Sequence, residues 1–166
     1  MTDRNPLVSI GIPTYNRPDG LSRTLECITT QTYQNIEIII SDNCSPNIAT
    51  TQVAQAFMAK DERIHYFRQE ENKGATFNFQ FVLEQATGKY FMWAADDDEW
   101  EDTYIEKCLE KFKNNDNLVL CYSEAVVRNF RGQSKFLLDS DMVTVGLSKV
   151  NAAQKVLLNQ RFFHCI

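Results

Sequence analysis

Three consecutive aspartates, at positions 96–98, are the residues of this chain best suited to chemistry. They follow an apolar run, KYFMWAA at 89–95, that has the pattern of a buried strand. Carboxylates this close together repel one another and resist desolvation, so a bound cation would stabilise them. Mg²⁺ and Mn²⁺ usually take one or two protein carboxylates and leave positions for water and substrate phosphates. The cluster therefore predicts an open metal site, with a solvated helix start as the alternative.

Polar residues also follow two apolar runs nearer the N-terminus. Residues 13–17, PTYNR, offer a ring at Tyr15 on which a nucleobase could stack and a charge at Arg17 for a phosphate. A turn in which the tyrosine packs locally is the alternative. Asp42 could accept a hydrogen bond from a base imide or a ribose hydroxyl, or it could cap local amides in a turn. Neither common glycine-rich phosphate loop occurs in the sequence, so side chains and a metal would have to hold any phosphate.

The segments that position these residues alternate between strand and helix patterns. Apolar and β-branched runs predict strands at 7–13, 36–42, 64–69, 89–95 and 118–122. Helical spacing predicts helices that begin at Pro18, span 49–59, run from Phe77 to near Gly88, centre on 104–112 and run from Ser148 to about Leu158. Apolar and polar residues that alternate on both sides of the turn-like stretch RGQS predict a hairpin within 124–138. This order predicts a three-layer α/β/α domain with a mostly parallel sheet, in which ligands bind beyond the carboxyl ends of the strands.

Composition limits the class of protein. The 166 residues are 43% hydrophobic and 23% charged, which suits one globular domain with a real core. The net charge of -5 gives no general affinity for nucleic acid. Five cysteines without a CxxC pair predict reduced thiols in a cytoplasmic protein, and no apolar run is long enough to span a bilayer. The sequence stops on an apolar stretch within QRFFHCI, residues 160–166, which predicts a piece of a longer protein.

Three stretches in this order carry a resemblance to a known family. They are VSIGIPTYNRPDGLSRTLECITTQTYQNIEIIISDNCS at 8–45, NKGATFNF at 72–79 and ATGKYFMWAADDDEW at 86–100. Together they resemble the GT-A-fold glycosyltransferases of family 2, over about residues 7–122. The resemblance implies a single Rossmann-like, nucleotide-sugar-binding GT-A domain over residues 1–166, cut before its acceptor-binding part.

The resemblance also implies a nucleotide site. Its residues would be Pro13, Thr14, Tyr15, Asn16, Arg17, Asp42, Asn43, Asn72, Gly74 and Asp96. The 13–17 loop would cradle the base, and Asp42 would bond the base, typically uracil. The 72–74 turn would border the base and the ribose.

The acidic cluster would be the DxD element of the family. Asp97 and Asp98 would then bind Mn²⁺ or Mg²⁺ on the diphosphate, with Asp96 near the ribose. Two positions depart from the family pattern. Ala95 stands where the first acid of the element is expected, and Ser41 stands where the family often has a second acid.

The activity implied is metal-dependent, inverting transfer of a sugar from a nucleoside diphosphate sugar, expected to be a UDP-sugar. The acceptor would be a saccharide or a lipid-linked molecule, as in cell-surface polysaccharide synthesis. The catalytic base would lie beyond Ile166. Family members can associate with the inner face of the membrane and form homodimers. The main alternative is a noncatalytic nucleotide-binding module of the same fold, whereas receiver and phosphatase-like domains need an aspartate that the first strand end, IPTYN, lacks.

Overall fold

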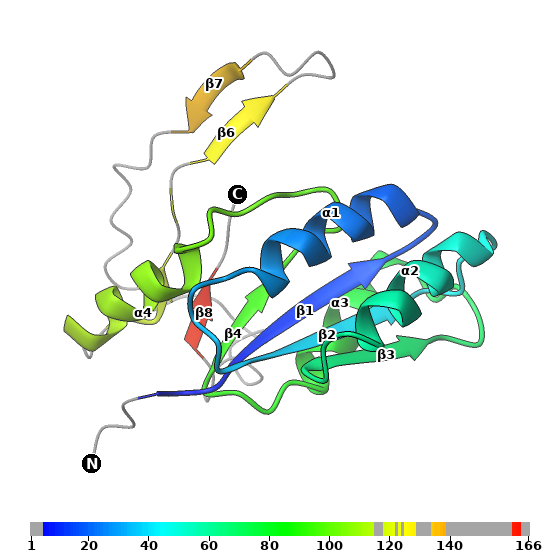
Figure 1. Ribbon diagram of the computed structural model, residues 1–166, viewed down its shortest axis with the longest axis horizontal. Helices are drawn as coiled ribbons and strands as arrows, with labels where there is room; N and C mark the ends of the chain where they lie inside the picture. Colours follow the sequence, from blue (N-terminus) through cyan, green and yellow to red (C-terminus); the bar gives the residue numbers. More distant parts are fainter. Residues whose placement is uncertain are drawn as a thin grey trace.

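The computed structural model describes residues 5–114, 118–121, 123, 125–128, 134–138 and 161–163. Strands and helices alternate along the chain from β1 to β5, as the sequence predicts (Figure 1). The strands are β1 (Val8–Thr14), β2 (Ile36–Asp42), β3 (Ile64–Arg68), β4 (Tyr90–Trp93), β5 (Leu120–Cys121), β6 (Ala125–Arg128), β7 (Ser134–Leu138) and β8 (Arg161–Phe163). The helices are α1 (Pro18–Thr29), α2 (Ile48–Met58), α3 (Ala75–Glu84) and α4 (Tyr104–Asn114).

Six of the strands form one sheet, in the order β3-β2-β1-β4-β8-β5, and every pair in it is parallel. The remaining two, β6 and β7, pair antiparallel, which confirms the predicted hairpin. The sequence did not predict β8, which lies between β4 and β5 in the sheet. The predicted helix from Ser148 to about Leu158 lies outside the described residues.

Helices cover both faces of this sheet (Figure 1), which confirms the predicted three layers. On one face, side chains from α1, α2 and α4 form a single apolar cluster with alternate residues of β1 and β2. On the other face, Val82 and Leu83 of α3 pack on Ile39 of β2 and Phe91 of β4. Neighbouring residues of β2, such as Ile38 and Ile39, thus belong to opposite clusters, because successive side chains of a strand point to opposite faces.

Local sequence explains how the helices begin and how β4 ends. Pro18 occupies the first turn of α1, where its missing N–H costs no hydrogen bond, and the Asn47 side chain caps α2 by accepting from the Ala49 amide. β4 is shorter than the predicted 89–95 strand. After it, the Ala94 amide still donates to the Gly11 carbonyl at 2.9 Å, but the chain then turns toward the aspartates.

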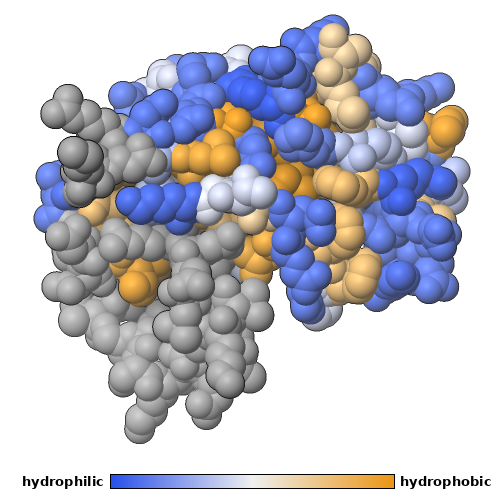
Figure 2. Space-filling model, turned by 90° about the horizontal axis from the view of Figure 1, so that it is seen from below, coloured by the Kyte–Doolittle hydropathy of each residue, from blue (hydrophilic) through white to orange (hydrophobic). Residues whose placement is uncertain are grey.

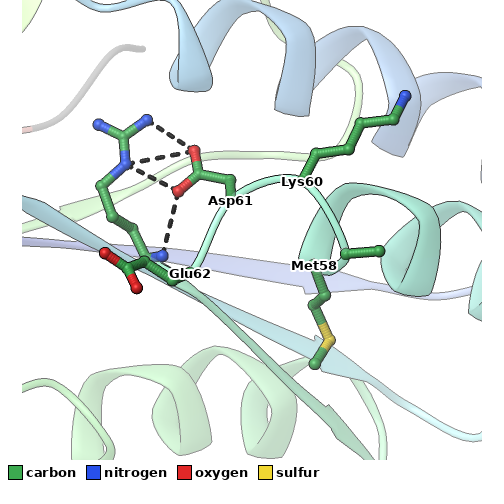
Figure 3. Close-up of a pocket in the computed structure, with 6 residues that line it drawn as sticks. Met58, Lys60, Asp61 and Glu62 are labelled. Carbon is green, nitrogen blue, oxygen red and sulfur yellow. Dashed lines mark hydrogen bonds and ion pairs between the residues drawn. The ribbon is translucent and has the colours of Figure 1, made fainter.

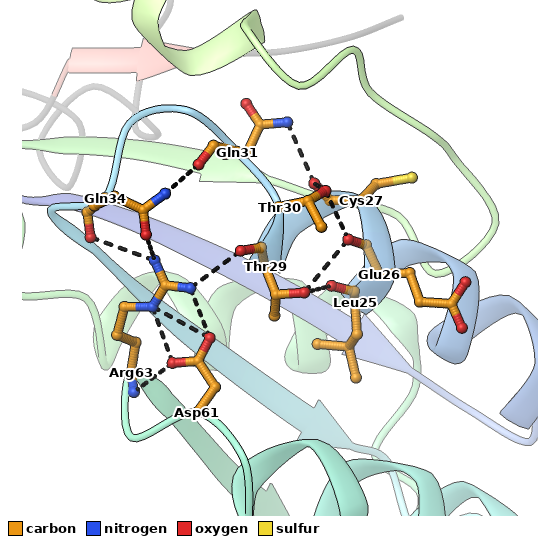
Figure 4. Close-up of polar contacts among 9 residues, drawn as sticks. All are labelled: Leu25, Glu26, Cys27, Thr29, Thr30, Gln31, Gln34, Asp61 and Arg63. Carbon is orange, nitrogen blue, oxygen red and sulfur yellow. Dashed lines mark hydrogen bonds and ion pairs between the residues drawn. The ribbon is translucent and has the colours of Figure 1, made fainter.

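At the amino edge of the sheet, opposite the strand ends that carry the predicted site, Arg63 contacts three segments of the chain (Figure 4). Its guanidinium donates to the Asp61 carboxylate at 2.6–3.2 Å, to the Gln34 side-chain oxygen at 3.0 Å and to the Thr29 carbonyl, in the last turn of α1, at 3.2 Å. Figure 3 shows the same ion pair beside an open pocket of about 440 Å³, which residues 58–63 line. Because these residues precede β3, the pocket lies at the amino edge of the sheet, away from the predicted site.

Replacing Arg63 by methionine is expected to lower the free energy of unfolding by about 1–3 kcal/mol, because the partly buried Asp61 and Thr29 lose charge-assisted hydrogen bonds. The hydrogen bond from Arg63 holds the pKa of Asp61 below its ordinary value. A depressed carboxyl pKa stabilises the fold above the unfolded pKa, and this contribution disappears as the pH falls through the folded pKa. The deficit of the variant should therefore be full at pH 7 and smaller below about pH 4.

Urea denaturation at pH 7 and again below about pH 4 measures how much stability Arg63→Met loses. Lys60→Met is the matched control, because Lys60 is an exposed cation in the same pocket and its loss should have little effect. An equal loss of stability in both variants would contradict the role given to Arg63.

The surface shown in Figure 2 has hydrophobic side chains among the hydrophilic ones. Among the described residues, the large hydrophobic side chains that are exposed are Tyr15, Ile48, Met58, Phe79 and Val119. No helix in this part of the chain combines the length and hydrophobicity needed to cross a membrane. The four described cysteines, Cys27, Cys44, Cys108 and Cys121, carry free thiols, as the sequence predicts.

Candidate functional site

The carboxyl ends of β1, β2 and β3 lie side by side. In the parallel register, Thr14 is paired with Asp42, and Asp42 with Arg68. The Asn43 amide donates to the Thr14 carbonyl at 3.0 Å, which continues the contact past the last residues of the strands. The 13–17 loop and the residues after β2 are therefore neighbours, as predicted from their place at the ends of parallel strands.

The aspartates after β4 reach the same place. The Thr14 hydroxyl donates to one oxygen of Asp96 at 2.7 Å, and the Arg17 guanidinium lies 3.5 Å from the other. Asp96 is nearly buried, and this burial raises the pKa of its carboxyl against the opposing effects of Thr14 and Arg17. Asp97 is half exposed and forms an ion pair of 2.5 Å with Arg17, while Asp98 is exposed.

Helix α1 fixes the backbone that carries these acids. The Thr24 hydroxyl contacts the carbonyls of Ala95 and Asp98 at 3.1 and 3.2 Å. At Gly20 the helix approaches so closely that an added Cβ would lie 2.1 Å from the carbonyl oxygen of Asp96. A side chain at position 20 would collide with this backbone, so the glycine allows the helix to support the acidic loop.

Asp42 is fully buried, and its oxygens have protein partners. One accepts from the Ser45 amide at 2.8 Å, and the other from the Tyr66 hydroxyl at 2.9 Å, with the Nε of Arg68 at 3.7 Å. Burial, followed by smaller effects that include the bond to Asp42, raises the pKa of Tyr66 to about 12. Of the two uses that the sequence allowed for Asp42, the capping of a local amide is present. Contact with a base stays a prediction.

Asn43 holds the 72–74 turn. Its side-chain oxygen accepts from the Lys73 amide at 2.9 Å, and its side-chain nitrogen donates to Asn72 at 2.9 Å and to the Gly74 carbonyl at 3.2 Å. The backbone of Gly74 has φ +84°, a conformation that residues with a side chain rarely adopt. This explains why a glycine occupies the position. The turn predicted at NKG therefore lies beside the ends of β1 and β2.

Sequence reasoning missed Asn78, a buried residue of α3 that joins the ends of β1 and β2. Its side-chain nitrogen donates to the Ser41 carbonyl at 2.9 Å and to the Thr14 carbonyl at 3.3 Å, while its oxygen accepts from the Ser41 hydroxyl at 2.5 Å. The only signal in the sequence is an amide between two phenylalanines, Phe77 and Phe79, in an otherwise apolar stretch.

Ser45 was also missed. Its hydroxyl accepts from the Asn16 amide at 2.7 Å and so ties the tip of the 13–17 loop to the turn after β2. Asn16 has φ +58°, a left-handed conformation that asparagine tolerates better than most residues. The exposed ring of Tyr15 stands next to this fixed position.

The exposed carboxylates of Asp97 and Asp98 suit a divalent cation that takes its other ligands from water or from a bound diphosphate. Among the residues the structure describes, no three histidine, cysteine or acidic side chains gather into a metal site of their own. Asp97 and Asp98 nevertheless present carboxylate oxygens at the surface, the donors that Mg²⁺ and Mn²⁺ prefer. A cation there would need further oxygens from water or from a bound diphosphate.

Comparison with known proteins gives the family. Residues 9–148 match the family described as Glycosyl transferase family 2. TuaG of Bacillus subtilis, whose name assigns it provisionally to teichuronic acid biosynthesis as a glycosyltransferase, is 38% identical over 110 residues, which are 66% of this chain and 43% of TuaG. The chain thus spans less than half of this relative.

Solved structures give the fold. TarS of S. aureus, residues 1–349 in complex with UDP-GlcNAc, matches with a TM-score of 0.67 at 22% identity, over 77% of this chain and 37% of that one. The mannosyltransferase PcManGT of Pyrobaculum calidifontis, in complex with GDP-Man and Mn²⁺, matches with a TM-score of 0.65 at 19% identity, over 78% of this chain and 37% of PcManGT. The sheet and its flanking helices have the GT-A fold that the sequence predicted. With most of its length matched by the family, the chain belongs to glycosyl transferase family 2.

Proposed function

We propose that this chain is the donor-binding part of an inverting glycosyltransferase that takes its sugar from a nucleoside diphosphate sugar, with UDP as the expected nucleotide. The observation that carries the proposal is the convergence of four segments, 13–17, 42–45, 72–74 and 96–98, at the carboxyl edge of one parallel sheet. Relatives named for teichuronic and colanic acid biosynthesis support a role in cell-surface polysaccharide synthesis. We place this reaction at the inner face of the membrane because the resemblance to the family implies it. The acceptor would then be a saccharide or a lipid-linked molecule.

Each segment has a task in this proposal. Tyr15 offers its exposed ring to the base, and the 72–74 turn borders the base and ribose. Asp96, oriented by Thr14, faces the ribose, and Asp97 with Asp98 supplies carboxylates for the cation. Mn²⁺ or Mg²⁺ would neutralise the diphosphate leaving group when bound. The support is chemical. Carboxylate oxygens, an exposed aromatic ring and a positive charge lie at one edge of the sheet, and a nucleoside diphosphate with a cation would use all three.

The catalytic base belongs to the part of the protein that we place beyond Ile166. In an inverting transfer a carboxylate takes the proton of the acceptor hydroxyl, which attacks the anomeric carbon from the side opposite the leaving group. The assignments in the described part of the chain are all to the donor side. A full-length sequence without an acidic motif downstream would contradict this placement.

Calorimetric titration with UDP, GDP and dTDP, each with and without Mn²⁺, tests the proposal directly. We expect one nucleotide to bind, and to bind far more tightly when Mn²⁺ is present. Absence of binding by all three would refute the donor site.

A noncatalytic nucleotide-binding module is the second candidate. Ala95, at the first position of the acidic element, favours it, since one carboxylate of the family pattern is missing there. The two candidates predict the same nucleotide binding but differ in turnover. Release of nucleoside diphosphate by the full-length protein, given donor and acceptor, would exclude the noncatalytic module.

Replacing Tyr15 by alanine is expected to weaken nucleotide binding by about 1–3 kcal/mol, the usual contribution of a base stacked on an aromatic ring. The ring is 45% exposed, so stability should hardly change. Calorimetry measures the affinity. Phe79→Ala is the matched control, because Phe79 is 40% exposed but lies beside Trp93. If both variants bind equally well, Tyr15 does not stack on the base.

A further inference from the structure

Arg17 and Asp97 form an ion pair at the place where a cation would have to bind. The Nη1 of Arg17 lies 2.5 Å from an Asp97 oxygen and 3.5 Å from an Asp96 oxygen. The side chains of Arg17 and Asp97 are 55% and 54% exposed, so both can exchange partners without unpacking the core. In the free protein the Arg17 guanidinium therefore occupies the Asp97 carboxylate, which we assign as a ligand of the metal.

The backbone on both sides of this ion pair is fixed. Arg17 immediately precedes α1, and the same helix holds the acidic loop through Thr24 and the close approach at Gly20. A cation that takes Asp97 must therefore displace the Arg17 side chain rather than shift the loop. The displaced guanidinium stays within reach of anything bound at the same carboxylate.

We propose that Arg17 couples metal binding to diphosphate binding, by holding Asp97 in the free protein and passing to the diphosphate when a cation takes Asp97. The inference rests on the proposed function and extends it. A divalent cation alone would break the ion pair and leave two positive groups side by side. A diphosphate that arrives with the cation gives the guanidinium a new anionic partner, for which its planar fork of donors is well suited.

This exchange has a thermodynamic signature. By linkage, Mn²⁺ must strengthen nucleotide binding by the same factor by which the nucleotide strengthens Mn²⁺ binding. If Arg17 blocks Asp97 in the free protein, Arg17→Met should raise the affinity for Mn²⁺ without nucleotide by about five- to ten-fold, since one competing partner and one repelling charge are removed. The coupling factor between Mn²⁺ and UDP should fall by about the same amount.

Arg23 provides a matched control. It lies on α1, the helix that follows Arg17, and its Nε is 3.8 Å from a Glu99 oxygen. The side chains of Arg23 and Glu99 are 54% and 57% exposed. Arg23→Met also removes one positive charge near the acidic loop but leaves the Arg17–Asp97 ion pair in place. We expect its affinity for Mn²⁺ to stay within about two-fold of the unchanged protein, because exposed charges farther away are screened.

Electron paramagnetic resonance of free Mn²⁺, without nucleotide, measures the affinity in the three proteins, and UDP titrations with and without Mn²⁺ then give the coupling factor. Equal Mn²⁺ affinity in Arg17→Met and the unchanged protein would overturn the proposal. So would an equal rise in Arg17→Met and Arg23→Met, or no detectable Mn²⁺ binding by Arg17→Met. Failure of the unchanged protein to bind any nucleotide would instead contradict the proposed function, and the nucleotide-free comparison would still decide the role of Arg17.

Discussion

Replacing Asp97 by asparagine is expected to remove metal-dependent nucleotide binding while the fold stays intact. The carboxylate is half exposed, and its partner in the structure is the equally exposed Arg17, so its loss should change stability by less than about 1 kcal/mol. Binding should suffer far more, because an amide oxygen carries no charge to hold a divalent cation. Even groups that only support a metal ligand contribute about 10–100-fold to affinity, so we expect a loss of at least about 100-fold.

Calorimetric titration of nucleotide in the presence of Mn²⁺ measures the effect of Asp97→Asn. Glu99→Gln is the matched control, since Glu99 is an exposed acid of the same loop that pairs with Arg23 instead. Binding in this control should be nearly unchanged. Unchanged binding in Asp97→Asn would exclude Asp97 as the metal ligand and direct attention to Asp98.

Replacing Asn78 by alanine is expected to lower the free energy of unfolding by about 2–4 kcal/mol. The side chain is only 3% exposed and makes three hydrogen bonds, to the Thr14 carbonyl and to the carbonyl and hydroxyl of Ser41. Its removal leaves buried polar groups without that partner and frees the ends of β1 and β2 from α3. Nucleotide binding should weaken as well, because the 13–17 loop starts from this junction.

Urea denaturation measures the loss of stability in Asn78→Ala. Gln80→Ala serves as the control, because Gln80 lies on the same helix but is exposed, and its side chain donates to the exposed Glu84 of the same helix. We expect that change to stay within about 0.5 kcal/mol. A loss of similar size in both variants would contradict the role given to the junction, because alanine is the better helix former at both positions and helix propensity cannot account for a loss.

Strand and helix positions were predictable where local pattern decides them. The run IEIIISD gave β2 with its observed bounds, and Pro18 marked the first residue of α1. The strand order was not predictable, because pairing between parallel strands joins residues far apart in the chain. The three residues of β8 are too few to show a period, yet they lie between β4 and β5.

The candidate site was predictable in its residue types but not in its contacts. The polar residues at strand ends are conspicuous in the sequence, since each follows an apolar run. Which aspartate is buried depends on the Thr14 hydroxyl, 82 positions away, and on a helix that approaches at Gly20. Asn78 was missed because its partners are mostly backbone carbonyls, which every sequence contains.

The central claim is that the carboxyl edge of the sheet binds the nucleotide, and the amide spectrum of the ¹⁵N-labelled chain tests it most directly. UDP added with Mg²⁺ is predicted to shift amide signals in four segments, 13–17, 42–45, 72–74 and 96–98. Signals of residues 58–63, which line the pocket at the opposite edge, should stay in place. Shifts that cluster at 58–63 and spare the four segments would contradict the account.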